Sequence, residues 1–360
     1  MHAARFSSRE LDDVRAWYAR HELPPTPLHR LPALAHALGI GELLVKDETA
    51  RFGLSSFKIL GAHYAIGRLV ARHGAAVSAI ACATAGNHGL AVTSAGRNLG
   101  LDVHVFVPVG TSPARVAALR AAGAQVIVTR VAYDATVRLM AAEARRRGWR
   151  VVSDTALGDD DPDAIPRAIM AGYTRLLDEA AAQWLGAPDI VIVQAGVGSL
   201  AGAVAGWLQA RFADPRRRPR LVIAEPAGSA CVLASLRAGR LVTLRRCAPT
   251  IMTGLRCGRV SPLAWPVLKA GVSAAVAVSD ARSVEAMRRL GEPAAADPIV
   301  AAGPSGACGL AALMAIAQEA GLRPVRDHLG LNRAASVFVI ATEALAPPGS
   351  APIAALQPGW

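Results

Sequence analysis

The sequence predicts a doubly wound α/β protein, and three observations carry that prediction. Nine short apolar runs alternate along the chain with longer segments of helical periodicity. The runs are almost continuously apolar, which is typical of parallel strands that are buried on both faces. The chain of 360 residues is also too long for one simple core. We therefore expect two domains, or one large α/β body with a smaller lobe.

The predicted strands are, in chain order, ELLVKDE, SAIACAT, DVHVFVP, AQVIVT, WRVVSD, DIVIVQ, RLVIAEP, AAVAVSD and SVFVIATE. Between them the periodicity predicts helices over residues 115–122, 133–147, 166–182 and 199–212. Ligands of doubly wound folds collect where the carboxyl ends of strands lead into helices. Four loops at such ends are unusual, namely TAGNHG, SDTALGDDD, QAGVGSLAG and TEALAPPGS. We expect all four loops to face one crevice.

The basic composition raises the alternative of a nucleic-acid partner, since the net charge is +12. The densest basic runs, residues 145–150 and 216–220, lie near the ends of predicted helices, where cations complement the helix dipole and face water. Aromatic residues make up only 4% of the chain, which leaves few rings for stacking on bases. The composition therefore favours a solvated basic surface and no nucleic-acid partner.

The five cysteines include no C-x-x-C pair and are an odd number, so they indicate neither a zinc site nor a disulfide scaffold. No stretch reaches about 18 consecutive apolar residues, and the first residues carry no apolar signal core. We expect a cytoplasmic protein with reduced thiols, without a metal site and without a membrane partner.

Lysine is almost absent, because only three of the 39 basic residues are lysines. Arginine can replace lysine wherever only a charge is needed, but it cannot lose its proton and attack a carbonyl group. Lys58 lies in the apolar stretch LSSFKILGA, at the expected start of a helix, where desolvation favours a neutral and nucleophilic amine. Lys46 precedes two acidic residues and is expected to be ion-paired, and Lys269 is expected at the surface.

Two glycine-containing motifs follow predicted strands. In QAGVGSLAG, Gly196, Gly198 and Gly202 are compatible with a phosphate-binding cup, and equally with a tight turn from strand to helix. In ATAGNHGLA, Asn87 stands at an expected helix N-cap, and with its neighbours it offers donors to a carboxylate or a ring hydroxyl. An ordinary capped turn is the alternative, and His88 by itself is more typical of a structural histidine.

These motifs together resemble a known family. The order S-x-FK, T-x-GNHG, GVGSL and a strand ending in TE is similar to the fold-type II pyridoxal-phosphate enzymes, the group that includes tryptophan synthase beta. The segments QAGVGSLAGAV, EPAGSACV, TIMTGLRCG and GPSGACGL resemble the diaminopropionate ammonia-lyases, over about residues 27–343. The resemblance implies a homodimer and two open doubly wound sheets. It predicts a large domain over residues 1–75 and 165–360 and a small domain over residues 76–164.

Pyridoxal phosphate is the cofactor that the resemblance implies. Lys58 would form a Schiff base with it, beside Phe57, while Asn87 would contact the ring hydroxyl and Thr342 would lie near the pyridine nitrogen. A neutral threonine there would leave that nitrogen unprotonated. Asp154, in SDTALG, matches the acid that moves the Cα proton of the L-isomer. The phosphate would be bound by Gly196, Val197, Gly198, Ser199 and Leu200, and the substrate carboxylate by Thr84, Ala85, Gly86 and His88.

The chain departs from the family pattern at three positions that bear on the substrate. Ala85 replaces an acid that handles the D-isomer, Pro304 replaces a common glutamate, and Leu157 replaces an aromatic residue. The resemblance thus implies an ammonia-lyase that converts 2,3-diaminopropionate to pyruvate and ammonia and favours the L-isomer. The alternative is a dehydratase or β-replacement enzyme that acts on serine, threonine or an O-acylserine.

Two cysteines stand in segments where relatives also carry cysteines. They are Cys231, in SACV, and Cys257, in LRCG. The resemblance implies that the two thiols are close in space. A reversible disulfide near the entrance of the site is one alternative and two free thiols are the other, since a cytosolic setting does not favour a permanent disulfide.

Overall fold

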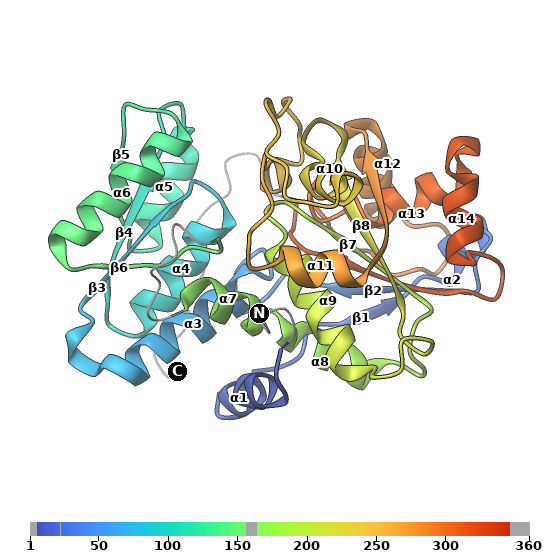
Figure 1. The fold of residues 1–360 in the computed structure, drawn as a ribbon, viewed down its shortest axis with the longest axis horizontal. Helices are drawn as coiled ribbons and strands as arrows, with labels where there is room; N and C mark the ends of the chain where they lie inside the picture. The colour runs from blue at the N-terminus through green and yellow to red at the C-terminus, as the bar shows by residue number, and fades with distance from the viewer. Residues whose placement is uncertain (1–5, 22, 156–163, 346–360) are drawn as a thin grey trace. The chain divides into compact units, whose positions relative to one another are not determined.

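The computed structural model describes residues 6–21, 23–155 and 164–345. These residues form two compact units, and their helices and strands are labelled in Figure 1. The large unit comprises residues 6–13, 24–50 and 174–345, and the small unit comprises residues 14–21, 23, 51–155 and 164–173. Both contain a mainly parallel sheet with helices on its faces, so the predicted α/β class is confirmed.

The sheet of the large unit has six strands in the order β1-β2-β10-β7-β8-β9. All neighbouring strands are parallel except β1, which pairs antiparallel with β2. The strands are β1 (Leu28–Arg30), β2 (Glu42–Asp47), β7 (Ile190–Gln194), β8 (Arg220–Pro226), β9 (Val272–Val278) and β10 (Ser336–Ala341). Going along the chain from β7, the strands move to one side through β8 and β9, and β10 then returns to the other side of β7. The order of this sheet therefore reverses between β7 and β10.

Helices cover both faces of this sheet. One face carries an apolar core, to which α2, α12, α13 and α14 contribute buried residues. Helix α9 packs on β7 and against α8 and α11, and it is buried from Ser199 to Gln209. The helices are α2 (Pro32–Leu38), α8 (Thr174–Gln183), α9 (Ser199–Arg211), α10 (Cys231–Ala238), α11 (Trp265–Gly271), α12 (Asp280–Gly291), α13 (Cys308–Gln318) and α14 (Arg323–Leu329).

The sheet of the small unit has four parallel strands in the order β5-β4-β3-β6. They are β3 (Ala79–Ala83), β4 (Asp102–Val107), β5 (Gln125–Val128) and β6 (Arg150–Val151). Because β3, β4 and β5 run to one side and β6 lies on the other side of β3, this order also reverses, between β3 and β6. The helices of this unit are α3 (Lys58–His73), α4 (Asn87–Asn98), α5 (Pro113–Ala121), α6 (Tyr133–Arg147) and α7 (Ile165–Gly172), together with the second half of α1 (Ser8–Ala19).

Local signals explain several of the helix ends. Ser112 caps α5 by accepting a hydrogen bond from the Arg115 N–H, with Pro113 as the first helical residue. Helix α6 ends at Gly148, whose φ of 72° is left-handed.

The nine predicted strands are all confirmed as β2 to β10, whereas the short antiparallel strand β1 was not predicted. The single helix predicted over residues 166–182 is wrong, since Tyr173 separates α7 from α8.

The predicted domain limits stay a prediction, and the compact units divide the chain differently. They assign residues 51–75 and 165–173 to the small unit, because α3 packs against both α4 and α7.

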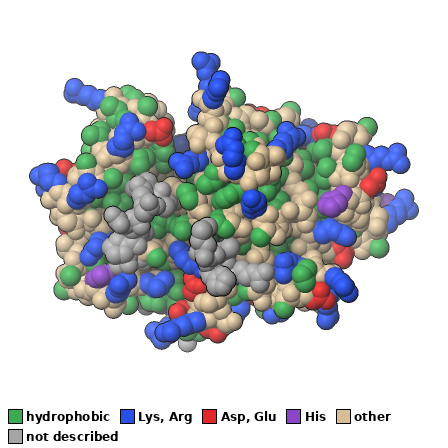
Figure 2. Space-filling model, in the orientation of Figure 1, with side chains coloured by type: hydrophobic (Ala, Val, Ile, Leu, Met, Phe, Trp, Pro, Cys, Tyr) green, Lys and Arg blue, Asp and Glu red, His purple; other side chains and the backbone are tan. Residues whose placement is uncertain are grey.

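Among the described residues no helix has both the length and the apolar composition needed to cross a bilayer. Figure 2 shows lysine and arginine side chains distributed over the face in view rather than gathered in one patch.

Two glycines bring α3 and α7 unusually close together in the small unit. A Cβ added to Gly61 would lie 2.6 Å from the Tyr173 ring and 2.8 Å from the carbonyl oxygen of Ile169. A Cβ on Gly172 would lie 2.8 Å from the carbonyl oxygen of Leu60. Real Cβ atoms do not approach so closely, so neither position accepts a larger residue without a shift of the backbone. This contact fixes the start of α3, where Lys58 lies.

We expect Gly61→Ala to destabilise the protein by about 1–3 kcal/mol, because the added methyl group overpacks the contact between α3 and α7. Urea unfolding followed by tryptophan fluorescence measures the effect. Gly291→Ala is the matched control: it also replaces a helical glycine, but no atom lies within 4 Å of the added carbon. The control should be neutral or slightly stabilising. Equal effects of the two changes would contradict this account of the contact.

Candidate active site

Lys58 and Asp154 form an ion pair in the small unit. The Lys58 Nζ lies 2.7 Å from Asp154 Oδ2, and the two side chains are 22% and 19% exposed. Lys58 is the first residue of α3, and Asp154 follows β6 at the reversal of strand order beside β3. Such a reversal is where doubly wound sheets bind ligands. The structure thus brings together the two residues that were predicted to be catalytic.

Electrostatics keep Asp154 charged in this pair. Burial by itself would raise the pKa of Asp154, but the charge and the hydrogen bond of the Lys58 ammonium group hold it well below its ordinary value. Burial lowers the pKa of His88, so its imidazole is neutral near pH 7. Its Nε2 lies 3.3 Å from the Val152 carbonyl oxygen, so we assign the ring proton to Nε2. The buried Nδ1 of His88 has no hydrogen-bond partner among the described residues.

Two aromatic rings form an apolar wall beside the Lys58 ammonium group. Phe57 is 7% exposed and Tyr173 is fully buried, and their ring centroids are 4.7 Å apart. The Lys58 Nζ lies 5.5 Å from the Phe57 centroid and 6.0 Å from the Tyr173 centroid. The apolar surroundings that the sequence predicted for Lys58 are present on this side. Sequence reasoning did not find Tyr173, which lies 115 positions after Lys58 and has no motif around it.

The loop after β3 and the first turn of α4 carry the residues predicted to bind the substrate carboxylate, Thr84, Ala85, Gly86 and His88. The Thr84 Oγ1 accepts a hydrogen bond from the Gly86 N–H at 3.1 Å. The prediction that Asn87 is the N-cap of the next helix is wrong, because α4 starts at Asn87 itself and Gly86 is its N-cap. The physical reason is the Thr84 turn, which leaves Gly86 extended, with φ of −113° and ψ of −162°.

The glycine loop of the large unit runs from β7 into the start of α9, as predicted. Gly198 has a φ of +91° and is the N-cap of α9. The first N–H groups of a helix have no partner within it and point outward, so they suit an anion. Gly196 is also constrained, because a Cβ there would lie 3.1 Å from the Gly254 carbonyl oxygen and 3.3 Å from the Cys257 Sγ. The hydrogen-bond donors that this loop offers to an anion are therefore backbone N–H groups.

Thr342 follows β10, which pairs with β7 at the reversal of strand order in the large unit, and it is 3% exposed. Its Oγ1 accepts a hydrogen bond of 2.7 Å from Gln194 Nε2. The same Nε2 lies 3.0 Å from the Ser305 and Ile340 carbonyl oxygens and 3.1 Å from that of Gly306. Gln194 was missed from the sequence, although a glutamine at the end of the apolar strand DIVIVQ is a signal for it.

The other two lysines have different environments. Lys46 is fully buried, and its ion pair is confirmed, with Glu179 at 3.1 Å as the partner. This partner comes from α8 and is distant in the chain, whereas Asp47, the next residue of the strand, points to the opposite face. Lys269 is exposed, as predicted, and donates a hydrogen bond to the Gly239 carbonyl oxygen.

All five cysteines carry free thiols. Cys231 Sγ donates a hydrogen bond to the Gly196 carbonyl oxygen at 3.6 Å, and Cys257 Sγ faces the Cα of the same residue. The two thiols therefore lie near one loop, and the reversible disulfide between them stays a prediction.

No group of three histidine, cysteine or acidic side chains able to hold a metal ion occurs in the part of the chain that the structure describes. Leu157, the third departure from the family pattern, lies outside the described residues.

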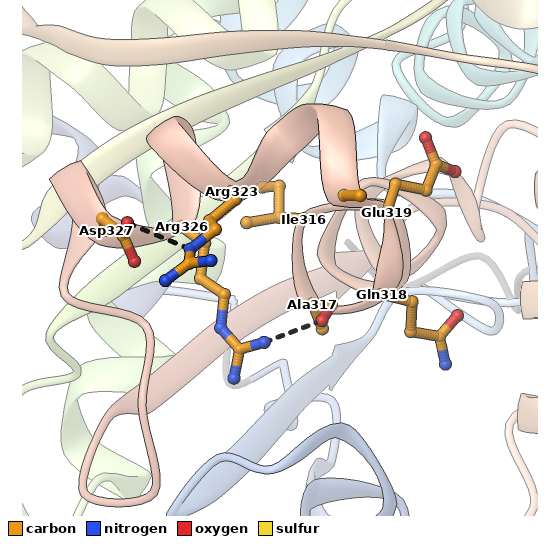
Figure 3. A pocket seen from close by; sticks show the side chains of 8 residues that line it. Ile316, Ala317, Gln318, Glu319, Arg323, Arg326 and Asp327 are labelled. Carbon is orange, nitrogen blue, oxygen red and sulfur yellow. Dashed lines mark hydrogen bonds and ion pairs between the residues drawn. The ribbon is translucent and has the colours of Figure 1, made fainter.

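A pocket of about 430 Å³ lies elsewhere in the large unit, at the end of α13 and along α14 (Figure 3). Arg326 donates hydrogen bonds to the carbonyl oxygens of Ala317 and Leu331, and Arg323 pairs with Asp327 at 3.8 Å. These cations are therefore engaged by neighbouring groups. None of the predicted site residues lines this pocket.

The family model described as "Pyridoxal-phosphate dependent enzyme" matches residues 20–326. The chain belongs to the pyridoxal-phosphate dependent enzyme family. The diaminopropionate ammonia-lyase of Escherichia coli K12 is 37% identical over 338 residues, which cover 89% of this chain and 84% of that protein. This similarity places the chain in the diaminopropionate ammonia-lyase group of the family.

Solved structures of the Escherichia coli enzyme are similar to this fold. A complex with an aminoacrylate-PLP azomethine reaction intermediate has a TM-score of 0.85 at 36% identity and covers 94% of this chain and 89% of that chain. A complex with D-serine has a TM-score of 0.86 at 35% identity and covers 94% and 90%. The biosynthetic L-threonine dehydratase of Mycobacterium leprae is more distant, at 28% identity over 68% of this chain and 54% of that protein.

Glu225, in the family-like segment EPAGSACV, is a buried acid at the end of β8. Its carboxyl oxygens accept hydrogen bonds of 2.8 Å from the N–H groups of Val232 and Leu233 at the start of α10. Burial raises the pKa of Glu225 from 4.5 to about 7, although these hydrogen bonds act in the opposite direction. The folded protein therefore binds a proton at Glu225 that the unfolded chain releases at lower pH.

This proton makes the free energy of unfolding depend on pH. The contribution of Glu225 is fully present below pH 4.5 and is lost as the pH rises to about 7. Glu225→Gln mimics the protonated acid, so the variant should match the wild type at pH 4.5 and be more stable at pH 8 by up to about 3 kcal/mol. Urea unfolding of both proteins across this range measures the difference. A difference that does not change with pH would contradict the assignment.

Proposed function

We propose that this protein is a pyridoxal-phosphate dependent ammonia-lyase that converts 2,3-diaminopropionate to pyruvate and ammonia and favours the L-isomer. The observation that carries the proposal is the ion pair of Lys58 with Asp154, in a chain that belongs to the diaminopropionate ammonia-lyase group. Lys58 offers the amine, and Asp154 offers a carboxylate 2.7 Å from it.

The residues present fit the cofactor. Lys58 supplies the amine that holds it, Phe57 supplies an apolar face, and Asn87 supplies a polar side chain at the start of α4. The loop Gly196, Val197, Gly198, Ser199 and Leu200 supplies backbone N–H groups for the phosphate. Thr342 Oγ1 accepts from Gln194, so its own proton remains for another acceptor, and an unprotonated pyridine nitrogen would be such an acceptor.

Pyridoxal phosphate, when bound, withdraws electrons from the substrate Cα and so makes its proton acidic. Asp154 is the group that takes this proton on its face. While it is paired with Lys58, Asp154 is a weak base, because the ammonium charge lowers its pKa. When the Lys58 charge moves away, burial raises the basicity of Asp154. The Thr84 hydroxyl accepts from the Gly86 N–H and does not use its own proton in that bond, so it offers a hydrogen bond that would orient the substrate carboxylate.

A dehydratase or β-replacement enzyme for serine, threonine or an O-acylserine is the second candidate. Ala85 and Pro304 favour it, because both lie in segments where this chain departs from the ammonia-lyase pattern. The lower identity to the threonine dehydratase argues against it.

Substrate profiling of the enzyme with its cofactor tests the proposal. We expect pyruvate and ammonia from 2,3-diaminopropionate, and turnover only of serine, threonine or O-acylserine would establish the alternative. Lys58→Ala should abolish both turnover and the visible absorbance of the bound cofactor, since alanine offers no amine. Lys269→Ala, at an exposed position, is the control and should change neither. A variant Lys58→Ala that keeps the absorbance, together with Lys46→Ala that loses it, would overturn the assignment of Lys58.

Stereochemistry gives a separate prediction. A base removes a Cα proton only on its own face, so each enantiomer needs its own positioned group. Asp154 is present and Ala85 cannot act as a base, so turnover of the D-isomer should be slower by about 10². Steady-state rates on both enantiomers measure this ratio, and Ala85→Asp should raise the D-rate selectively. Equal rates of the wild type on both isomers would refute the division of roles between the two positions.

We also propose a cytoplasmic location and a homodimer. The five free thiols support a reducing compartment. The family resemblance alone supports the dimer, and the mass of the protein in solution tests it.

A further inference from the structure

Tyr173 is buried beside the ion pair with an unused hydroxyl. Its relative exposure is 0%, and its oxygen has no hydrogen-bond partner among the described residues. Burying a hydroxyl without a partner costs free energy, and phenylalanine would fill the same space without that cost. The hydroxyl is therefore a group that the packing of the small unit does not need.

The position of Tyr173 is tightly fixed. It follows α7 directly, and its ring occupies the space that the absent side chain of Gly61 leaves on α3. The ring also packs on Phe57, with centroids 4.7 Å apart, and the Lys58 Nζ lies 6.0 Å from its centroid. Burial and the Asp154 carboxylate raise the pKa of the Tyr173 hydroxyl, and Lys58 acts in the opposite direction. The hydroxyl thus stays protonated near pH 7 and is a donor.

We propose that Tyr173 is a positioning residue whose hydroxyl donates a hydrogen bond to Asp154 when Lys58 leaves the ion pair. The inference rests on the proposed function, because it requires Lys58 to react with the aldehyde of the cofactor. In that reaction the ammonium group releases a proton to the medium, the nitrogen lone pair bonds to the aldehyde carbon, and the oxygen departs as water. Asp154 then loses the cation that lies 2.7 Å away in the pair.

A donor that forms a hydrogen bond to Asp154 lowers the free energy needed to separate Lys58 from this carboxylate. Of the neighbours that act electrostatically on Asp154, His88 is neutral and its assigned ring proton is directed to the Val152 carbonyl oxygen. Burial raises the pKa of the Cys82 thiol, and a thiol is a weak donor. Among these side chains the Tyr173 hydroxyl is the strongest neutral donor, and it would add to the backbone hydrogen bond that acts on Asp154. A hydrogen bond to a charged group is worth enough to change a rate about 10-fold or more.

The test uses cofactor-free protein to which pyridoxal phosphate is added. The growth of visible absorbance gives the rate of reaction, and borohydride reduction with mass mapping locates the modified lysine. Tyr173→Phe keeps the ring and should slow the reaction at Lys58 by about 10-fold. The thermal midpoint of the cofactor-free variant should be unchanged or higher, because an unpartnered hydroxyl has been removed.

Tyr18→Phe is the matched control. Tyr18 is 1% exposed in the same unit, and its hydroxyl donates to the Leu60 carbonyl oxygen on α3. This change should leave the rate at Lys58 as in the wild type. If Tyr173→Phe reacts as fast as the wild type, or is slower only with a lowered thermal midpoint, the inference is overturned. If the wild type forms no adduct at Lys58, the proposed function fails, and this inference fails with it.

Discussion

Parallel strand pairing, combined with a reversal of strand order, is the constraint on which the candidate site depends. Parallel strands in a sheet carry their carboxyl ends to the same edge, and a reversal sends the connections of two neighbouring strands to opposite faces. In the small unit this happens between β3 and β6, and residues 84–88 and Asp154 follow those strands. In the large unit it happens between β7 and β10, where Gln194 and Thr342 form a hydrogen bond. Residues that are far apart in the chain thus meet because of the topology.

Only three basic residues are lysines, and at two of them the structure gives a reason why arginine would not serve. The Lys46 ammonium group donates to the Thr26 carbonyl oxygen and to Gln183 Oε1, and it pairs with Glu179. Three acceptors around one compact cation suit an ammonium group better than a planar guanidinium. Lys58 is needed for a different reason, since it must be able to lose its proton. Nothing in the structure explains why Lys269 is not an arginine.

Much of the fold could be predicted from the sequence, because apolar runs of strand length are a strong and local signal. The glycine loop, Lys58 and Asp154 were approached through motifs of a few residues, but the ion pair between Lys58 and Asp154 was not predicted. Strand β1, the break at Tyr173 and the Glu179 partner of Lys46 were out of reach, since each depends on packing between distant segments. The contact of Gly61 with Tyr173 illustrates this best. A glycine inside a helix signals a close approach, but it does not name the partner.

The ion pair couples the two chemical roles of the site. While Lys58 is an ammonium ion, it cannot attack a carbonyl group, and its charge keeps Asp154 from acting as a strong base. Once the Lys58 nitrogen is engaged elsewhere, the burial that opposes charge on Asp154 is no longer offset by that cation, so the carboxylate becomes more basic. A neutral donor such as Tyr173 would limit this rise without removing it, because a hydrogen bond stabilises the carboxylate less than an adjacent charge does. The base therefore gains strength only after the amine has reacted, which is the order that an elimination on a bound amino acid requires.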